Sequence, residues 1–411
     1  MKVTFYYVRH GKTLFNEVGR IQGACDSPLT EEGIRGAEDT ASALRKVHFD
    51  HAFCSSSERA WDTAKMICQY HDLKPVCMKG LKEFDFGSLD GEPMEKYASK
   101  VWGDHMLNDW TPYGGESLEL FDQRTRKAFG EILDTCKDGD KVLIVSHGSF
   151  IMHLMKTLLN FDQESYAERR KAEGKPTMPN CGICLFTYDN GVWSLTEEPM
   201  TADEYRLKHD PKQVSFWYVR HGETVFNVQK RMQGQCDSPL TEKGIHQVEE
   251  TREKLKDISF DHAYCSTAER TRDTAEILLK GRKIQAIPDE RLKEVFYGKL
   301  EGTKYEDNWD DIWKRHLSLD YKDLGGENRA DVSCRMLSFL RDVVDVADDG
   351  DHILLVSHGD YYLSLLETVF HMERKKIYES AREEGRNPVP NAGAFTFHYK
   401  DGSFVMDHLM Q

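Results

Sequence analysis

The chain is one domain-sized sequence written twice, and this repeat limits the folds that it can adopt. Val8-Arg9-His10-Gly11 returns 211 residues later as Val219-Arg220-His221-Gly222. Other motifs return at the same spacing: Asp26–Thr30 as Asp237–Thr241, Glu58-Arg59 as Glu269-Arg270, Leu81–Glu83 as Leu292–Glu294, Gly114–Glu116 as Gly325–Glu327, and Ser146–Gly148 as Ser357–Gly359. The units of solenoid proteins are far shorter than this. The sequence therefore predicts two copies of one globular domain.

Alignment of the halves places the domains at residues 1–205 and 212–411, each long enough to bury a full core. Residues 201–213 are predicted to form a short polar connector. A connector of this length permits the two domains to pack as an intramolecular pseudo-dimer.

The composition excludes several classes of partner. The 55 Lys and Arg against 70 Asp and Glu give a net charge of −15, which disfavours nucleic acid and anionic membranes. No apolar run is long enough to span a bilayer, and residues 1–8 resemble a first strand rather than a signal peptide. Seven of the ten cysteines lie in the first half, so no disulfide framework was duplicated with the domain. We expect a cytoplasmic protein with reduced thiols.

Strand and helix patterns alternate within each half. Apolar runs at residues 4–8 and 141–145 predict buried strands, and residues 31–45 and 118–136 have helical composition. Asp189-Asn190-Gly191 is a turn signal between two further strands. We therefore expect two tandem three-layer α/β/α domains, each on a mainly parallel sheet with one antiparallel edge strand.

Arginine and histidine follow the ends of two predicted buried strands. Arg9-His10 follows the first strand and His147 follows a later one, and ligands of open α/β sheets bind beyond the carboxyl ends of strands. Guanidinium forks suit phosphate oxygens, and a neutral imidazole is a competent nucleophile toward phosphorus. Metal binding is a weaker reading, because adjacent arginines repel a cation and no His-Glu-x-x-His or Cys/His spacing occurs. A serine triad would need Gly-x-Ser-x-Gly, which the chain lacks.

The motifs also resemble those of a known family. The segments that carry the resemblance are Arg9–Thr13, Asn16, Gly19–Gly23, Ser27–Thr30, Cys54–Ala60, Glu83 and Ser146–Gly148. In this order they are similar to the histidine phosphatase superfamily, in its phosphoglycerate-mutase-like branch, over nearly all of each half. The acid phosphatase and phytase branch fits less well, because its Arg-His-Gly-x-Arg-x-Pro motif is replaced here by Arg-His-Gly followed by Lys12-Thr13.

The resemblance implies a role for each matched position. His10 and His221 would be the nucleophiles that become phosphorylated, while Glu83 and Glu294 would protonate the leaving oxygen and then activate water. The remaining pocket positions would be His147 and His358, with the phosphate-binding residues Arg9, Asn16, Gln22, Arg59, Arg220, Asn227, Gln233 and Arg270. The resemblance requires no metal or organic cofactor, and it implies a small phosphorylated substrate.

The direction of phosphoryl transfer is the remaining question. Mutases of the family carry a basic insert, whereas residues 84–113 hold six acidic and two basic residues and residues 295–324 hold seven and five. An acidic rim disfavours a doubly anionic substrate, so we expect a phosphomonoester hydrolase with two active sites. The alternatives are a phosphoglycerate mutase-type phosphotransferase, or a protein with one catalytic and one phospho-ligand-binding domain. Differences at Lys12 against Glu223, and at residues 84–88 against 295–299, predict divergent substrate preferences.

Overall fold

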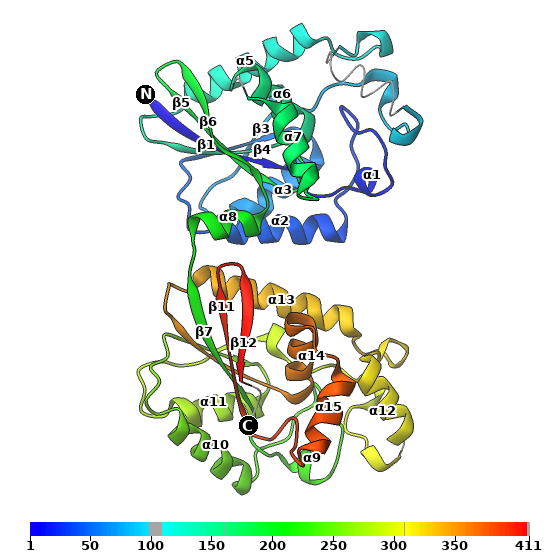
Figure 1. The fold of residues 1–411 in the computed structure, drawn as a ribbon, viewed down its shortest axis with the longest axis vertical. Helices are drawn as coiled ribbons and strands as arrows, with labels where there is room; N and C mark the ends of the chain where they lie inside the picture. Colours follow the sequence, from blue (N-terminus) through cyan, green and yellow to red (C-terminus); the bar gives the residue numbers. More distant parts are fainter. Residues whose placement is uncertain (98–108, 160, 308, 409–411) are drawn as a thin grey trace. The chain divides into compact units, whose positions relative to one another are not determined.

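The computed structural model describes residues 1–97, 109–159, 161–307 and 309–408. The chain divides into two compact units, Met1–His209 and Asp210–Gln411, drawn in blue to green and in green to red in Figure 1. None of the helices in the described part of the chain combines the length and apolar character needed to cross a bilayer.

The first unit is built on a six-stranded sheet in the order β3-β2-β4-β1-β5-β6. Its strands are β1 (Lys2–Arg9), β2 (His51–Ser55), β3 (Val76–Met78), β4 (Lys141–Ser146), β5 (Ile183–Asp189) and β6 (Val192–Met200). β3, β2, β4 and β1 are parallel, whereas β5 runs antiparallel to both β1 and β6. The expected mainly parallel sheet is confirmed. The reversed strand is β5, and β6 completes a hairpin at the sheet edge.

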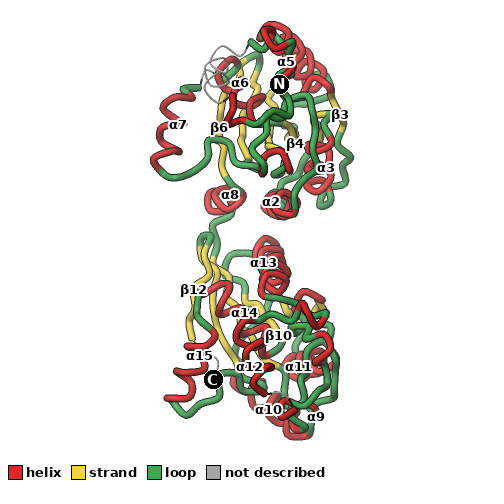
Figure 2. Tube along the Cα trace, turned by 90° about the vertical axis from the view of Figure 1, so that its right-hand side faces the viewer, coloured by secondary structure: helices red, strands yellow, loops and turns green. Residues whose placement is uncertain are grey.

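Helices cover both faces of this sheet (Figure 2). They are α1 (Leu14–Glu17), α2 (Glu31–Ala43), α3 (Glu58–Cys68), α5 (Leu118–Leu133), α6 (Gly148–Thr157), α7 (Gln163–Ala172) and α8 (Ala202–His209). Side chains of β1 alternate between two cores, because successive strand residues point to opposite faces. Phe5 and Tyr7 lie in the core with α5 and α6, whereas Tyr6 and Val8 lie in the core with α2, α3 and α8. The three-layer architecture is thus confirmed.

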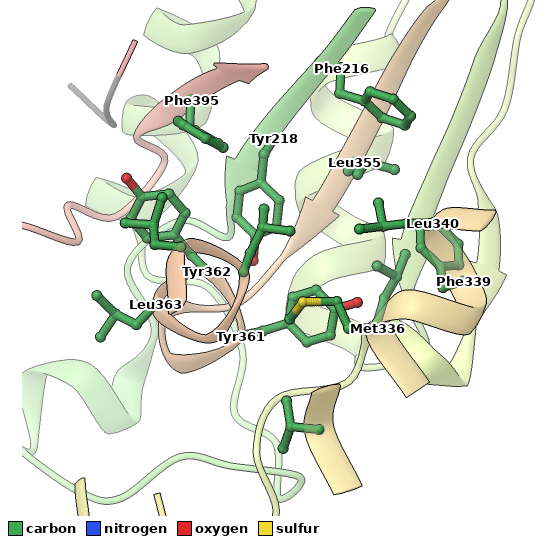
Figure 3. Close-up of a cluster of buried hydrophobic side chains, with 14 of the residues drawn as sticks. Phe216, Tyr218, Met336, Phe339, Leu340, Leu355, Tyr361, Tyr362, Leu363 and Phe395 are labelled. Carbon is green, nitrogen blue, oxygen red and sulfur yellow. The ribbon is translucent and has the colours of Figure 1, made fainter. Parts of the chain in front are cut away.

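The second unit repeats this plan, with the sheet order β12-β11-β7-β10-β8-β9. Its strands are β7 (Gln213–Arg220), β8 (His262–Ser266), β9 (Ile287–Asp289), β10 (His352–Ser357), β11 (Ala394–Lys400) and β12 (Ser403–His408). Its helices are α9 (Val225–Val228), α10 (Glu242–Lys254), α11 (Glu269–Leu279), α12 (Trp309–Ser318), α13 (Arg329–Val346), α14 (Gly359–Phe370) and α15 (Arg374–Glu383). Figure 3 shows how Tyr218 and Leu355 of the sheet pack against Met336 of α13 and Tyr361 of α14.

The segment expected to be a polar connector is largely a helix of the first unit. Helix α8 packs against α2, where Tyr205 is buried and Arg206 forms an ion pair of 2.9 Å with Asp39. The first compact unit consequently extends to His209, four residues beyond the expected end at 205, and β7 begins at Gln213. The helix was missed because its sequence is mostly polar and few of its residues are buried.

The predicted hairpin turn is present between β5 and β6. Asn190 and Gly191 have φ angles of 49° and 94°, the left-handed values that a two-residue hairpin turn requires. Asp401 and Gly402 repeat this geometry between β11 and β12, with φ angles of 45° and 90°. The turn chemistry visible in the sequence therefore fixes this connection in both units.

Candidate active sites

Each unit brings two histidines together beyond the carboxyl ends of its central strands. Arg9 on β1 pairs in register with Ser146 on β4, and the backbone N–H of His10 donates to the Ser146 carbonyl at 2.9 Å. The rings of His10 and His147 consequently lie 5.2 Å apart, centroid to centroid. In the second unit, the rings of His221 and His358 are 5.4 Å apart. The expected convergence of residues 137 positions apart is therefore present in both units.

The hydrogen bond of His10 leaves one ring nitrogen available for chemistry. Nδ1 lies 2.8 Å from the Gly11 carbonyl oxygen, which can only accept, so Nδ1 carries the proton and Nε2 carries the lone pair. Burial, together with the positive charges of Arg59 and Arg9, holds the pKa of His10 well below the ordinary histidine value. His221 has the same bond at 2.8 Å, and burial with Arg270 and Arg220 lowers its pKa in the same way. Both imidazoles are neutral, as a nucleophile must be.

The ring of His147 is hydrogen-bonded to Arg59 and to a serine. Arg59 Nη2 donates to His147 Nδ1 at 3.0 Å, and His147 Nε2 lies 2.7 Å from the Ser55 hydroxyl. Burial, Arg59 and then His10 hold the pKa of His147 well below its usual value, so this ring is also neutral. Both of its nitrogens have protein partners. The structure therefore gives His147 a role in orienting the arginine, and His358 repeats it with Arg270 and Ser266 at 2.9 and 2.8 Å.

The arginines are anchored at one side and carry an unpaired donor. Arg59 is 1% exposed, and its Nη atoms donate to the carbonyls of Cys25 and Gly23 and to the Asp26 carboxylate at 2.8–3.0 Å. Arg9 Nη1 donates to the Met178 carbonyl at 2.5 Å. Among the described residues, buried Nε donors without a hydrogen-bond partner include those of all four of these arginines, Arg9, Arg59, Arg220 and Arg270. The contacts of these arginines thus fix positive charge beside the histidine ring, where it suits an oxyanion.

Gly148 makes room for the first of these guanidinium groups. A Cβ atom at this position would lie 3.2 Å from Arg9 Nε and 3.4 Å from its Cζ. Gly359 stands in the same relation to Arg220, with a distance of 3.3 Å to Nε. A larger residue at the glycine of the Ser-His-Gly motif would therefore press on the arginine and shift it.

The two candidate acid–base carboxyls are buried beside these groups. Glu83 accepts from the backbone N–H groups of Phe84 and Ser149 at 3.1 and 2.9 Å. Burial raises the pKa of Glu83, while those two bonds and the arginines partly oppose the shift. In the second unit, burial and then the negative charge of Asp360 raise the pKa of Glu294 to about 7. A carboxyl titrating near neutrality can act as acid and then as base.

The two amide side chains expected to bind phosphate are mainly engaged within the protein. The side-chain oxygen of Asn16 accepts from the N–H of Thr13 and the amide of Asn180, both at 3.2 Å. Gln22 accepts from the Thr13 hydroxyl at 2.7 Å and donates to the Ser27 hydroxyl at 2.9 Å. The second unit repeats these bonds at Asn227 and Gln233. These bonds order the loop, and the remaining N–H groups are the ones available to a substrate, so phosphate binding by these residues stays a prediction.

A partly buried arginine that was not among the predicted site residues supports Glu83. Arg124 on α5 donates to the carbonyls of Gly80, Lys82 and Glu83 at 2.8–3.0 Å, and its Nε and Nη2 bind the Glu116 carboxylate at 2.7 and 2.9 Å. Arg335 and Glu327 form the same arrangement around Glu294. Glu116 therefore supports, through Arg124, the loop that carries Glu83. Arg124 and Arg335, like Glu116 and Glu327, are 211 residues apart, and this repeat is the sequence signal that could have identified them.

Three further supporting residues also repeat. The Tyr7 hydroxyl donates to the His147 carbonyl at 2.6 Å and accepts from its N–H at 2.8 Å, which fixes the backbone before α6. Asp26 binds Arg59 and also accepts from the N–H of Glu58 at 2.5 Å. The third residue is Ser55, whose hydroxyl contacts His147. The counterparts with the same bonds are Tyr218, Asp237 and Ser266.

The charge difference between Lys12 and Glu223 is balanced locally. Lys12 forms an ion pair of 2.6 Å with Glu32, and Glu223 forms one of 2.9 Å with Lys243. Glu32 and Lys243 occupy the same position of the repeat, so the pair has reversed its polarity between the units. This position therefore offers little net charge with which to discriminate substrates. Asp85 and Lys299, the other expected source of divergence, have exposed side chains.

Among the described residues, His51, Cys136 and Asp140 have ligand atoms within 4.8 Å of one another and form a group that could hold a metal ion. His51 is the first residue of β2, whereas Ser55, which contacts His147, is its last. This group therefore lies toward the opposite end of β2 from the histidine pair.

Comparisons with known proteins agree with the internal repeat. The sequence profile of the histidine phosphatase superfamily (branch 1) matches residues 5–198 and again 216–409. The probable phosphoglycerate mutase GpmB of Yersinia pestis (strain Pestoides F) is 35% identical over 196 residues, covering 46% of this chain and 86% of that protein. A phosphoglycerate mutase structure from Bacillus anthracis str. Sterne is 29% identical, with a TM-score of 0.41 over 48% of this chain and 92% of that one. A mycobacterial glucosyl-3-phosphoglycerate phosphatase is 24% identical, with a TM-score of 0.42 over 48% and 99%. The chain belongs to the histidine phosphatase superfamily and carries two copies of its domain.

Proposed function

We propose that the chain is a phosphomonoester hydrolase that works through a phosphohistidine and has two active sites. One observation carries this proposal: each unit holds a buried neutral imidazole, with Nε2 left unprotonated, beside two arginines whose positive charges lower its pKa. That arrangement suits an oxyanion bearing a transferable phosphoryl group.

The first step forms the phosphoenzyme. His10 Nε2 attacks phosphorus while the proton on Nδ1 stays there, hydrogen-bonded to the Gly11 carbonyl, and the bond from phosphorus to the ester oxygen breaks. The leaving oxygen takes the proton of Glu83. Arg9 and Arg59 stabilise the charge that spreads over the phosphoryl oxygens.

The second step regenerates the enzyme. Glu83, now a carboxylate, accepts a proton from water as that water attacks the phosphorus. The bond from phosphorus to Nε2 breaks, inorganic phosphate leaves, and Glu83 is again protonated. His221 and Glu294 would perform the same steps in the second unit. Because the arginines supply the positive charge, we propose that neither step needs a metal ion.

The acidic character of the segment after each catalytic glutamate supports hydrolysis over mutase activity. Residues 84–113, of which 98–108 lie outside the described part of the structure, and residues 295–324 are both net acidic. A mutase must hold a second anionic group while excluding water, which an acidic rim disfavours. The relatives named as mutases keep transfer between phosphoglycerates as the second candidate.

Active-site variants test the proposal. Hydrolysis of p-nitrophenyl phosphate is measured for His10→Ala, His221→Ala and the double variant. We expect partial loss in each single variant and complete loss in the double variant. Full activity in the double variant would exclude both histidines from the mechanism. Complete loss in one single variant alone would assign catalysis to that unit and leave the other as a phospho-ligand-binding domain.

A second assay separates the two reaction types. The unmodified chain is given a phosphoglycerate, and inorganic phosphate release is compared with isomer formation. Hydrolysis predicts that phosphate release dominates. Isomer formation faster than the hydrolysis of simple monoesters would identify a mutase.

A further inference from the structure

In the second unit, a further buried carboxylate lies beside Glu294. Asp360 is the second residue of α14 and is 7% exposed. Its backbone N–H donates to Glu294 Oε2 at 2.9 Å, and the N–H of Tyr361 donates to Oε1 at 2.8 Å. The carboxyl of Asp360 and that of Glu294 therefore belong to one packed group at the start of α14.

Three side chains hold Asp360 as an anion. The Tyr297 hydroxyl donates to Oδ2 at 2.5 Å, His316 Nδ1 lies 3.2 Å from the same oxygen, and Arg374 Nη1 donates to Oδ1 at 3.3 Å. Burial opposes ionisation of Asp360, but His316 and Arg374 hold its pKa well below the usual range. Arg374 is further fixed by Glu367 at 3.0 Å. The negative charge is thus fixed in place beside Glu294.

The first unit has replaced this group. Ser149 stands in the place of Asp360, and Phe86 in the place of Tyr297. Gln163 occupies the position of Arg374, and Ala167 that of Tyr378, whose hydroxyl lies 3.0 Å from His316 Nε2. His105, the counterpart of His316, lies outside the described residues. The acid, Tyr297 and Arg374 thus differ together, so the two units differ in electrostatics immediately behind otherwise matching pockets.

We propose that Asp360 is a positioning residue that keeps Glu294 protonated, which adapts the second site to phosphate esters of alkyl alcohols. An alkoxide is a poor leaving group and departs only with a proton, whereas an aryl oxide such as p-nitrophenolate departs without one. A carboxyl held in its acid form near neutral pH serves the first kind of ester. The inference rests on the proposed function of the site.

The surrounding charges agree in sign with this inference. Burial and then Asp360 raise the pKa of Glu294 to about 7, while the N–H donors and Arg270 act against the rise. In the first unit, burial raises the pKa of Glu83 without a neighbouring anion among its causes. Further titratable groups that interact with Glu294 or Asp360 are Tyr218, Tyr297, Tyr305, Tyr321, His316, Arg374 and Tyr378.

The kinetic test isolates the second site in a His10→Ala chain. The pH profile of kcat/KM is recorded for an alkyl phosphate and for p-nitrophenyl phosphate, with and without Asp360→Asn. For the alkyl ester, we expect Asp360→Asn to move the alkaline limb about one pH unit lower. The aryl ester should show little change. A uniform fall at every pH, or equal effects on both esters, would show that Asp360 only supports the fold.

A spectroscopic measurement covers the case in which Asp360→Asn fails to fold. Infrared titration of the unmodified chain follows its buried carboxyls, which Glu83→Gln and Glu294→Gln assign. We expect Glu294 to titrate at higher pH than Glu83, and the reverse order overturns the inference. This readout is independent of turnover. If neither His10→Ala nor His221→Ala alters hydrolysis, the proposed function fails while the titration still decides the role of Asp360.

Discussion

Replacement of Arg124 by glutamine tests whether the supporting arginine places the general acid. The guanidinium of Arg124 binds the loop that ends at Glu83 at three points, the carbonyls of Gly80, Lys82 and Glu83. It also binds Glu116 through two nitrogens. Glutamine offers two N–H donors in place of the five that make these bonds, and it removes the charge. The Glu83 carboxyl should therefore lose its fixed position while His10 and Arg59 keep theirs.

The bonds that are lost set the size of the effect. Each hydrogen bond to a charged group contributes roughly 1.5–3 kcal/mol, and Arg124 is partly exposed, so we expect the first unit to lose about 2–3 kcal/mol of unfolding free energy. A displacement of about 1 Å of a catalytic group costs on the order of 100-fold in rate. We therefore expect kcat/KM for an alkyl phosphate to fall about 100-fold at the first site, with a much smaller fall for p-nitrophenyl phosphate.

The assay uses a His221→Ala chain, in which only the first site works. Arg335→Gln in the same chain is the matched control, because it removes the equivalent arginine from the silenced unit. It should destabilise the second unit and leave the measured kcat/KM unchanged. Equal losses for the alkyl and aryl esters would refute the reasoning, since they would show that Arg124 does not act through the acid.

Three further outcomes follow from the contacts. Burial depresses the pKa of His10, so below about pH 6.5 the unfolded chain binds more protons than the folded chain. The free energy of unfolding should therefore decrease as the pH drops through that value. In thermal melts, the melting temperature of His10→Gln should decrease less with pH than that of the unmodified chain. Gly148→Ala should weaken inhibition by inorganic phosphate at the first site about tenfold. Gly130→Ala is the control, because a Cβ atom there would have no other atom within 4 Å. It should leave inhibition unchanged and stabilise α5 by roughly 0.5–1 kcal/mol. Because the Lys12–Glu32 pair is exposed, Lys12→Glu should lower the melting temperature only slightly, and the added Glu32→Lys should restore it. An altered substrate profile in the double variant would contradict a purely local role.

The sequence was sufficient for the layered fold and for the convergence of the main site residues. Apolar runs and their alternation located β1 and β4, and residues placed just after them had to meet at one sheet edge. The short strand β3 and the polar helix α8 were missed, since three residues or a mostly polar surface give little periodic signal. Tertiary packing decides such elements, and it is not visible in local composition.

The roles of individual side chains were harder to predict than their positions. Repetition at a spacing of 211 marks every residue that both units need, but it does not separate a group that reacts from one that supports. Gln22 and His147 repeat as well as His10 does, yet their polar atoms are engaged by the protein, whereas Nε2 of His10 retains its lone pair.

Asp360 shows the opposite limit of the repeat. It does not recur, so comparison of the halves marks it only as one difference among many. Its position behind Glu294, with a tyrosine, a histidine and an arginine holding its charge, distinguishes it from differences such as Lys12 against Glu223, whose charges are balanced locally. A substitution between duplicated sites can change chemistry when its charge is both buried and near a reacting group. By that criterion, we expect the two sites to differ in how the leaving group is protonated. We do not expect them to differ mainly in how the rim of each pocket recognises the substrate.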